Sequence, residues 1–240
     1  MGMEIALIPA AMFIVGIGMM IYMKKKRDSL APGYAQQEMK RFVKEMVPQL
    51  SEEEFHVIDC KTEIDFGSSV VSFFRTTHSI PDSVGISLKT SEGSIVHTGD
   101  FKFDQTAIPM YQTDFARLAE IGQSGVLALL SPSSNAEKPA TVASELQIAD
   151  EVYDNIRYWE GRIIVACVAS NLQRLQQVLD AAYRSGRKVV LTGQDFGRII
   201  KTTMKLGKLT LPDENLLVTL KEMKNYADEE ILILETGQMG

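Results

Sequence analysis

Two stretches decide the fold of this chain, Ser72-Phe-Phe-Arg-Thr-Thr-His78-Ser-Ile-Pro-Asp82 and Val96-His97-Thr-Gly-Asp100-Phe-Lys-Phe-Asp104. Each stretch begins as an apolar run, which predicts a strand, and each strand ends in a side chain that can bind a metal. These side chains are His78 in the first stretch and Asp100 in the second. Because strand ends are where rigid scaffolds hold ligands, the two residues are the first candidates for a functional site.

His78 and Asp100 each also have an ordinary structural interpretation. A single histidine is more often a hydrogen-bonded structural residue, although Pro81 turns the chain after the strand and so presents His78 outward. Asp100 follows a glycine that permits close backbone approach, but a carboxylate in this place can also cap turn amides. Two neighbours are weaker candidates. His97 is structural or exposed, and Asp82 either orients His78 or forms a turn, which we favour.

The composition is that of an ordinary globular protein. Its 240 residues suffice for one large domain or two small ones, and its net charge of -6 excludes a chain that is basic throughout. RNA binding would therefore need a local basic face. The two cysteines, Cys60 and Cys167, lie far apart and lack zinc-finger spacing, which favours reduced, buried thiols in a cytosolic protein.

The amino-terminal segment differs in kind from the rest of the chain. Residues Ile5–Met23 carry no charge, and the basic run Lys24–Arg27 follows at once. A helix of that length spans roughly 28 Å, which is close to the hydrocarbon thickness of a bilayer. We therefore expect an uncleaved membrane anchor that tethers the following, cytoplasmic part of the chain to the inner face of the plasma membrane. The alternative is a buried core helix.

Short strands dominate the next part of the chain, and helices alternate with strands in the last part. We expect strands at residues 63–66, 70–75, 85–90 and 94–97, a helix at 113–121 with Thr113 as its N-cap, and an apolar strand at 126–130 buried on both faces. Further helices are expected at 145–159, 172–183 and 196–206, with strands at 162–168, 188–191 and 231–234. This alternation predicts a parallel sheet.

Two glycines follow strands of this expected parallel sheet, namely Gly193 and Gly237. Ligands collect at the carboxyl edges of parallel strands, where backbone amides can hold phosphate, although glycine after a strand is also ordinary turn chemistry. Positive charge is concentrated in the same third of the chain, at Arg184, Arg187, Lys188, Arg198, Lys201, Lys205 and Lys208. A solvated helix face is the ordinary interpretation of these cations, and a track for an RNA backbone is the functional one.

The two opening stretches and the chain that follows them resemble the ribonuclease J family, which has a metallo-β-lactamase fold interrupted by a β-CASP domain. The resemblance runs from about residue 55 to residue 240 and corresponds to the middle of the family's chains. Besides the opening stretches, it includes Leu118–Gly122, Gly125–Ser131 and Ala169–Gln177. Within the family, Val190–Gly193 and Ile233–Gly240 are most similar to the second paralogue of Gram-positive bacteria. That paralogue is implied to be a weak nuclease that pairs with the active one.

The resemblance implies an α/β fold in two parts. A partial metallo-β-lactamase αββα layer is expected over residues 55–135, and a partial β-CASP-type parallel α/β sheet over residues 136–240. Residues 1–54 do not match the family, and they contain the expected N-terminal hydrophobic helix and a linker. A gene remnant, a fusion or a misjoined reading frame would each explain why this segment stands where the first part of the catalytic domain should be.

By resemblance, His78 matches the third metal motif of the family and Asp100 the bridging fourth motif, which implies zinc as the cofactor. The candidate RNA-binding residues are Ser170, Asn171, Arg174, Gly193, Thr236 and Gly237. The family's His-x-His-x-Asp-His signature is missing from residues 1–77. Pro132 stands where the family commonly has an acidic residue, and Gln173 stands where the active paralogue has a histidine. We therefore assign no catalytic residue.

Three functions follow from these observations. The favoured one is a truncated, catalytically deficient RNA-processing protein of the ribonuclease J type, which binds RNA or forms a hetero-oligomer with an active ribonuclease J paralogue. The first alternative is an active, metal-dependent 5′–3′ exo- and endoribonuclease. The second is a membrane-tethered scaffold, in contact with the bilayer through residues 5–23, or a gene fragment without function.

Overall fold

The structure is a computed structural model that describes residues 58–236, except for 135, 138, 140–141 and 194–195. The expected anchor at residues 5–23 and the linker after it lie outside this range. Within the described part of the chain, no helix has both the length and the apolar character needed to span a bilayer. The chain divides into two compact units, Met1–Thr141 and Val142–Gly240. Each unit is described by itself below.

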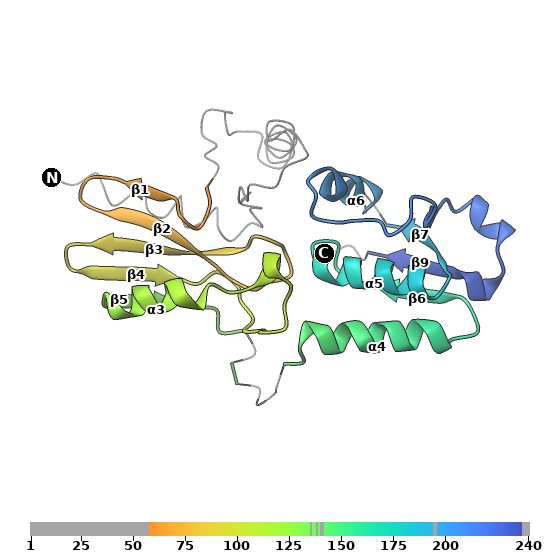
Figure 1. Ribbon diagram of the computed structural model, residues 1–240, viewed down its shortest axis with the longest axis horizontal. Coiled ribbons are helices and arrows are strands. Elements are labelled where there is room, and N and C mark those ends of the chain that lie inside the picture. Colours follow the sequence, from red (N-terminus) through yellow and green to blue (C-terminus); the bar gives the residue numbers. More distant parts are fainter. Residues whose placement is uncertain (1–57, 135, 138, 140–141, 194–195, 237–240) are drawn as a thin grey trace. The chain divides into compact units, whose positions relative to one another are not determined.

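The first unit is built on a five-stranded sheet with the order β1-β2-β3-β4-β5. Its first four strands form an antiparallel meander, and β5 joins β4 in parallel after the chain has passed through helix α3 (Figure 1). The elements are β1 (Glu63–Asp65), β2 (Val70–Arg75), β3 (Val84–Thr90), β4 (Gly93–His97), the 3-10 turn η2 (Pro109–Tyr111), α3 (Phe115–Gln123) and β5 (Val126–Leu130). The antiparallel meander and the one helix before β5 agree with the expected order of elements.

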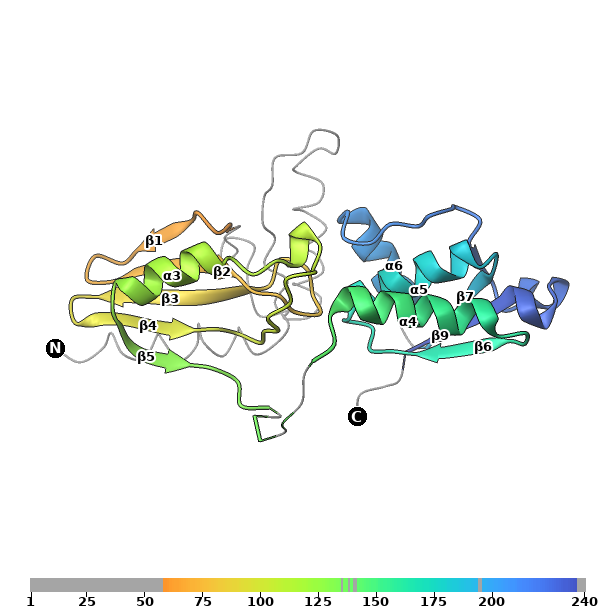
Figure 2. The ribbon, with the colours of Figure 1, turned by 60° about the horizontal axis from the view of Figure 1, so that its bottom comes forward.

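Each face of this sheet has its own apolar cluster, because successive residues of a strand point to opposite faces. On one face, Phe73 of β2 packs with Ile58 and Val84. On the other face, Phe74 packs with Val96 of β4 and with Ile121 of α3, which lies across the sheet (Figure 2). The helix therefore covers the Phe74 face.

The prediction that residues 126–130 are buried on both faces is wrong. All five residues of β5 are exposed, and Leu127 and Leu129 are each 64% exposed. The strand pairs with β4 on one side and forms the edge of the sheet on the other. An unbroken apolar run is typical of a doubly covered parallel strand, but the run itself does not supply the layers that would cover it.

The predicted N-cap of α3 is also wrong by one residue. Asp114, not Thr113, accepts a hydrogen bond from the backbone N–H of Arg117 at 3.0 Å and so caps the helix. Thr113 is buried, and its hydroxyl oxygen accepts a hydrogen bond from the backbone N–H of Thr77 at 3.1 Å. This contact between Thr113 and Thr77 places the start of α3 beside the end of β2, close to His78 in the chain.

The second unit is an all-parallel sheet of four strands in the order β6-β9-β7-β8 (Figure 2). Helices alternate with these strands, as the sequence predicted, although β8 has only two residues and was not predicted. The elements are α4 (Glu145–Tyr158), β6 (Ile163–Ala166), α5 (Leu172–Arg184), β7 (Lys188–Thr192), α6 (Phe196–Lys205), β8 (Leu217–Val218), the 3-10 turns η3 (Glu222–Asn225) and η4 (Asp228–Glu230), and β9 (Ile231–Glu235).

One large apolar cluster holds the second unit together. It joins Ile156 of α4, Leu175 and Leu179 of α5, and Ile200 of α6 to Leu232 of β9. Helices α4 and α5 lie side by side in both ribbon views (Figures 1 and 2). Because the three helices share one cluster with the sheet, the opposite face carries a separate set of side chains, including the fully buried Val190 and Ile231.

A half-buried carboxyl group on α5 makes the stability of this unit depend on pH. Burial raises the pKa of Asp180, although Gln176 donates a hydrogen bond to its Oδ1 at 2.8 Å. Because the pKa of Asp180 is higher in the folded than in the unfolded state, its protonated form stabilises the fold at pH values below the unfolded-state pKa of about 3.9. This stabilisation is lost as the pH rises through the pKa of the folded state. Asp180→Asn should therefore be more stable than the wild type at pH 7, and its advantage should shrink toward pH 4.

Urea unfolding at pH 4.5 and pH 7 checks this prediction, with the free energy of unfolding compared at each pH. Asp150→Asn on the exposed side of α4 is the control, and it should show no comparable trend. A constant difference between Asp180→Asn and the wild type across this range would contradict the assignment.

Candidate functional site

The structure brings the two metal-binding candidates of the first unit together. Nε2 of His78 lies 3.7 Å from Oδ2 of Asp100, and their side chains are 34% and 71% exposed. His78 follows β2 by three residues, and Asp100 follows β4 by three residues. The two chain segments therefore leave the sheet at the same end, and they place an imidazole and a carboxylate side by side at its surface.

Backbone and hydroxyl contacts fix these two segments to each other. The N–H of Lys102 donates to the carbonyl of Thr77 at 2.8 Å, and the hydroxyl of Thr76 donates to the carbonyl of Asp100 at 3.5 Å. The hydroxyls of Thr77 and Thr113 lie 2.9 Å apart in the interior. The backbones that carry His78 and Asp100 are thus held from both sides before any ligand arrives.

The turn before Asp100 depends on a glycine. Gly99 has φ +63°, and a side chain there would lie 3.2 Å from the carbonyl oxygen of Val84. The N–H of Gly99 donates to Nδ1 of His97 at 3.1 Å. His97 therefore supports the turn, which agrees with its interpretation as a structural residue. Asp82 has φ +60°, which is a turn conformation and agrees with the interpretation we favoured.

The donor set of this pair suits zinc. Imidazole nitrogen and carboxylate oxygen both bind zinc at about 2.0–2.2 Å, so that two ligand atoms on one tetrahedral ion lie roughly 3.4 Å apart. The 3.7 Å between His78 and Asp100 is close to that separation. Among residues 58–236, with their gaps, no three His, Cys, Asp or Glu side chains cluster as a metal site would need. Among the described residues, His78 and Asp100 are therefore a pair of candidate ligands.

The carboxyl edge of the parallel sheet in the second unit joins two of the predicted RNA-binding residues. Gly193 follows β7 with φ +115°, and a Cβ on it would lie 2.7 Å from the Cγ2 of Thr236, which follows β9. The N–H of Thr236 donates to the carbonyl of Thr192 at 3.3 Å. Gly237 lies outside the described residues.

The other three predicted residues stand where α5 begins. Asn171 is the N-cap of this helix, and its side chain accepts a hydrogen bond from the N–H of Arg174 at 3.1 Å. Ser170 accepts from the N–H of Leu172 at 3.0 Å through its carbonyl oxygen. The guanidinium of Arg174 binds Gln177 at 2.9 Å and Glu145 at 3.4 Å, so it is already paired within the unit.

The basic run of this unit separates into cations of different kinds. Arg187 is buried and donates to the backbone carbonyls of Trp159, Gly161 and Ile231, so it stabilises the fold. The exposed cations Arg198, Lys201 and Lys205 follow one face of α6 at helical spacing, opposite the buried Phe196, Ile200 and Thr203. Sequence reasoning could not separate these two kinds, because both occur in the same charged run.

A hollow of about 670 Å³ lies elsewhere in this unit, between α4 and β6. Its walls include Val152 and Ile156 of α4 and the whole of β6. Of the residues that the sequence singled out as functional, Arg174 alone is on its lining. The hollow and the candidate site at the strand ends are therefore different places.

Comparison with known proteins agrees with these features. Residues 160–240 match the model of the family described as "Ribonuclease J, beta-CASP domain". The chain is 55% identical over 186 residues to ribonuclease J 2 of Streptococcus pyogenes serotype M3, with 78% of this chain and 34% of the relative covered. It is 46% identical over 183 residues to ribonuclease J2 of Bacillus subtilis strain 168, with 76% and 33% covered.

A solved structure adds support for the fold alone. The crystal structure of a protein of unknown function from Enterococcus faecalis V583 matches with a TM-score of 0.57 at 13% identity, covering 86% of this chain and 52% of that one. Sheet, helices and matches together define a protein of the β-CASP class. More particularly, the chain belongs to the ribonuclease J family and is similar to relatives named as its second paralogue, ribonuclease J 2 or J2. It spans about a third of the length of these curated relatives.

Proposed function

We propose that this chain is an RNA-processing protein of the ribonuclease J type, which binds RNA but does not cleave it by itself. The observation that carries the proposal is the 3.7 Å approach of His78 to Asp100 at two neighbouring strand ends. The names of the relatives, ribonuclease J 2 and J2, support the same function.

In this proposal His78 and Asp100 are zinc ligands. Zinc would supply a Lewis acid and an activated water for phosphodiester hydrolysis. The contribution of the chain is to hold imidazole and carboxylate in place through the Thr77–Thr113 hydroxyl pair and the Lys102–Thr77 backbone bond. A dinuclear centre needs more ligands than this pair, so cleavage would come from an active ribonuclease J paralogue with which the chain forms a hetero-oligomer.

RNA would bind to the second unit in this proposal. The exposed cations of α6, Arg198, Lys201 and Lys205, can follow a phosphate backbone. We propose that phosphate also binds at the strand-end residues Gly193 and Thr236, which lie against each other, and near Ser170, Asn171 and Arg174 at the start of α5. Gly237 stays a further candidate from the sequence.

A titration of single-stranded RNA against salt tests the binding. The logarithm of the association constant should fall linearly with the logarithm of the salt concentration, by roughly 0.7 for each phosphate contacted. Lys201→Gln should reduce the steepness of this slope by roughly 0.7, the contribution of one phosphate contact. Lys61→Gln removes an exposed charge from the first unit and should leave the slope unchanged. A slope near zero for the wild type would remove the proposal of phosphate binding.

The same purified chain with zinc tests the proposed lack of cleavage. We expect a labelled RNA to stay intact while it is bound, and to be degraded once an active ribonuclease J paralogue is added. Rapid degradation by the purified chain alone would show that it is a nuclease in its own right, and would overturn this part of the proposal.

A further inference from the structure

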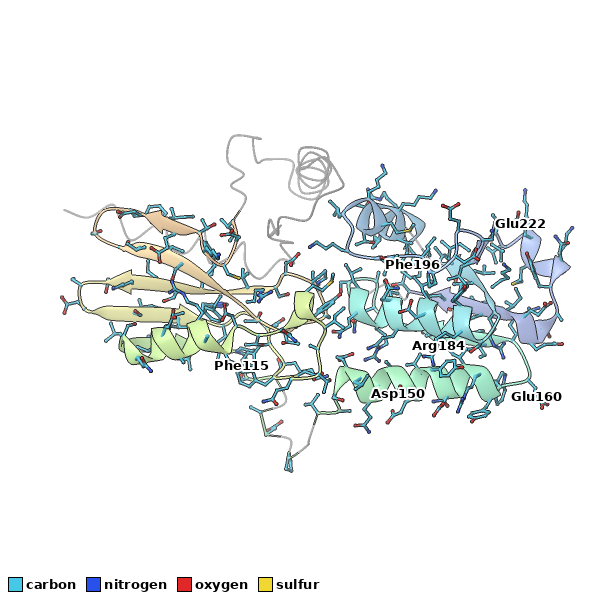
Figure 3. All side chains as sticks on the ribbon, in the orientation of Figure 1. Phe115, Asp150, Glu160, Arg184, Phe196 and Glu222 are labelled. Carbon is cyan, nitrogen blue, oxygen red and sulfur yellow. The ribbon has the colours of Figure 1, made fainter. Side chains whose placement is uncertain are left out.

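Three phenylalanines, two on the segment that follows Asp100 and one at the start of α3, form a ladder of rings. The ring centroids of Phe101 and Phe103 are 4.7 Å apart, and those of Phe103 and Phe115 are 5.5 Å apart. Phe103 is 62% exposed and Phe115 is 46% exposed, and Figure 3 labels Phe115 at the start of α3. The rings are tilted to one another by 39° and 45°, and Phe103 and Phe115 expose aromatic surface that a folded interior would normally cover.

The backbone that carries these rings is firmly held. Phe101 directly follows Asp100, and the next residue, Lys102, binds the carbonyl of Thr77 through its N–H at 2.8 Å. The ammonium of Lys102 pairs with the buried carboxylate of Asp104 at 3.4 Å. Phe101 and Phe103 therefore flank Lys102, which is held by its backbone N–H and by its side-chain ammonium.

Phe115 is anchored to the same strand end from the other side. The preceding residue, Asp114, donates its N–H to the carbonyl of Arg75, the last residue of β2, at 3.1 Å. The same aspartate caps α3, so the first turn of the helix is fixed where it presents Phe115. The three rings are thus presented by the backbone segments that also position His78 and Asp100.

We propose that Phe101, Phe103 and Phe115 form a stacking platform for unpaired nucleobases, which holds single-stranded RNA beside the His78–Asp100 pair. This inference rests on the proposed RNA binding and adds a site to it in the first unit. Every nucleobase has a π-face, so a ladder of exposed rings binds bases with little regard to sequence. Without a bound metal, the 71% exposed carboxylate of Asp100 offers no attraction to phosphate, so we assign RNA binding at the rings to the bases.

A single substitution tests the platform in the full chain. Phe103→Leu keeps an apolar side chain but removes the ring shared by both ring pairs, and it should weaken binding of a short single-stranded RNA by about tenfold. Phe66→Leu is the matched control, because Phe66 is 65% exposed in the turn between β1 and β2 and has no ring partner among the described aromatic pairs. Fluorescence anisotropy of the labelled RNA measures both variants.

A second probe separates base stacking from charge. An abasic oligonucleotide with the same number of phosphates should bind the wild type and Phe103→Leu equally. Equal RNA affinity for the wild type and Phe103→Leu would overturn the platform while leaving the proposed RNA binding intact. Absence of RNA binding by the wild type would overturn both. If Phe103→Leu changes the sedimentation of the protein instead of its RNA affinity, the ladder is a protein contact and the proposal fails.

Discussion

Gly85→Ala should remove about 3 kcal/mol from the free energy of unfolding. A Cβ at this position would lie within 3.0 Å of three ring carbons of Phe74, its partner across β2 and β3. Phe74 is fully buried between the sheet and α3, so its ring has no space into which it can move. Urea unfolding followed by circular dichroism measures the loss.

Two variants control this experiment. Gly122→Ala lies inside α3, where a new Cβ meets nothing within 4 Å, and it should stabilise the protein by roughly 0.5–1 kcal/mol. Phe74→Leu combined with Gly85→Ala should cost less than the sum of the two single changes, because the smaller side chain relieves the clash. A Gly85→Ala protein as stable as the wild type would show that the close contact between Phe74 and Gly85 does not constrain the sheet.

Arg187→Met should destabilise the second unit by about 2–4 kcal/mol. The guanidinium donates to the carbonyls of Trp159, Gly161 and Ile231 and so joins three separate places of the chain. Burial lowers the pKa of Arg187, so part of the loss is offset when methionine removes a buried charge. The fluorescence of Trp159, the single tryptophan of the chain, follows the transition directly in urea.

The neighbouring cation supplies the control for this prediction. Lys188→Met removes a hydrogen bond of 3.0 Å from an exposed ammonium to the carbonyl of Asn215, and the change should stay within about 0.5 kcal/mol. The loss of stability for Arg187→Lys should lie between those for Arg187→Met and Lys188→Met. Lysine keeps the charge but loses the planar fork that reaches several carbonyls. Equal midpoints for Arg187→Met and Lys188→Met would contradict the role we assign to the guanidinium.

Elements that carry their own local signal could be predicted from the sequence. Strand β2 was expected at 70–75 and is Val70–Arg75, because its β-branched and aromatic run ends in polar residues on both sides. Helix α5 was expected at 172–183 and is Leu172–Arg184, since its apolar spacing is unbroken up to Ser185-Gly186. Such features depend on neighbours in the chain, which a sequence displays directly.

Features that depend on distant partners could not be predicted. The exposure of β5 depends on which layers cover it, and the N-cap of α3 moved to Asp114 because Thr113 binds Thr77, which is 36 residues away in the chain. Arg187 has the sequence neighbourhood of a solvated cation, yet its partners lie 26 to 44 residues away.

The candidate site shows the same division. His78 and Asp100 could be found because each ends a recognisable strand, and the 3.7 Å between them follows from the pairing of β2 with β3 and of β3 with β4. The ring ladder was missed although Phe101 and Phe103 stand in a stretch that the sequence singled out. Its third member, Phe115, joins it only through the fold, and exposure cannot be inferred from an aromatic residue in a sequence.

Because β5 is exposed on both faces, its side chains take little part in the packing of the interior of the first unit. Shortening the side chain of Phe74 or Val96 opens a void, whereas shortening that of Leu127 or Leu129 only reshapes a surface. The strand contributes to cohesion through its backbone bonds to β4. Its side chains are therefore free to vary in size and polarity while the hydrogen-bonded ribbon beneath them stays the same.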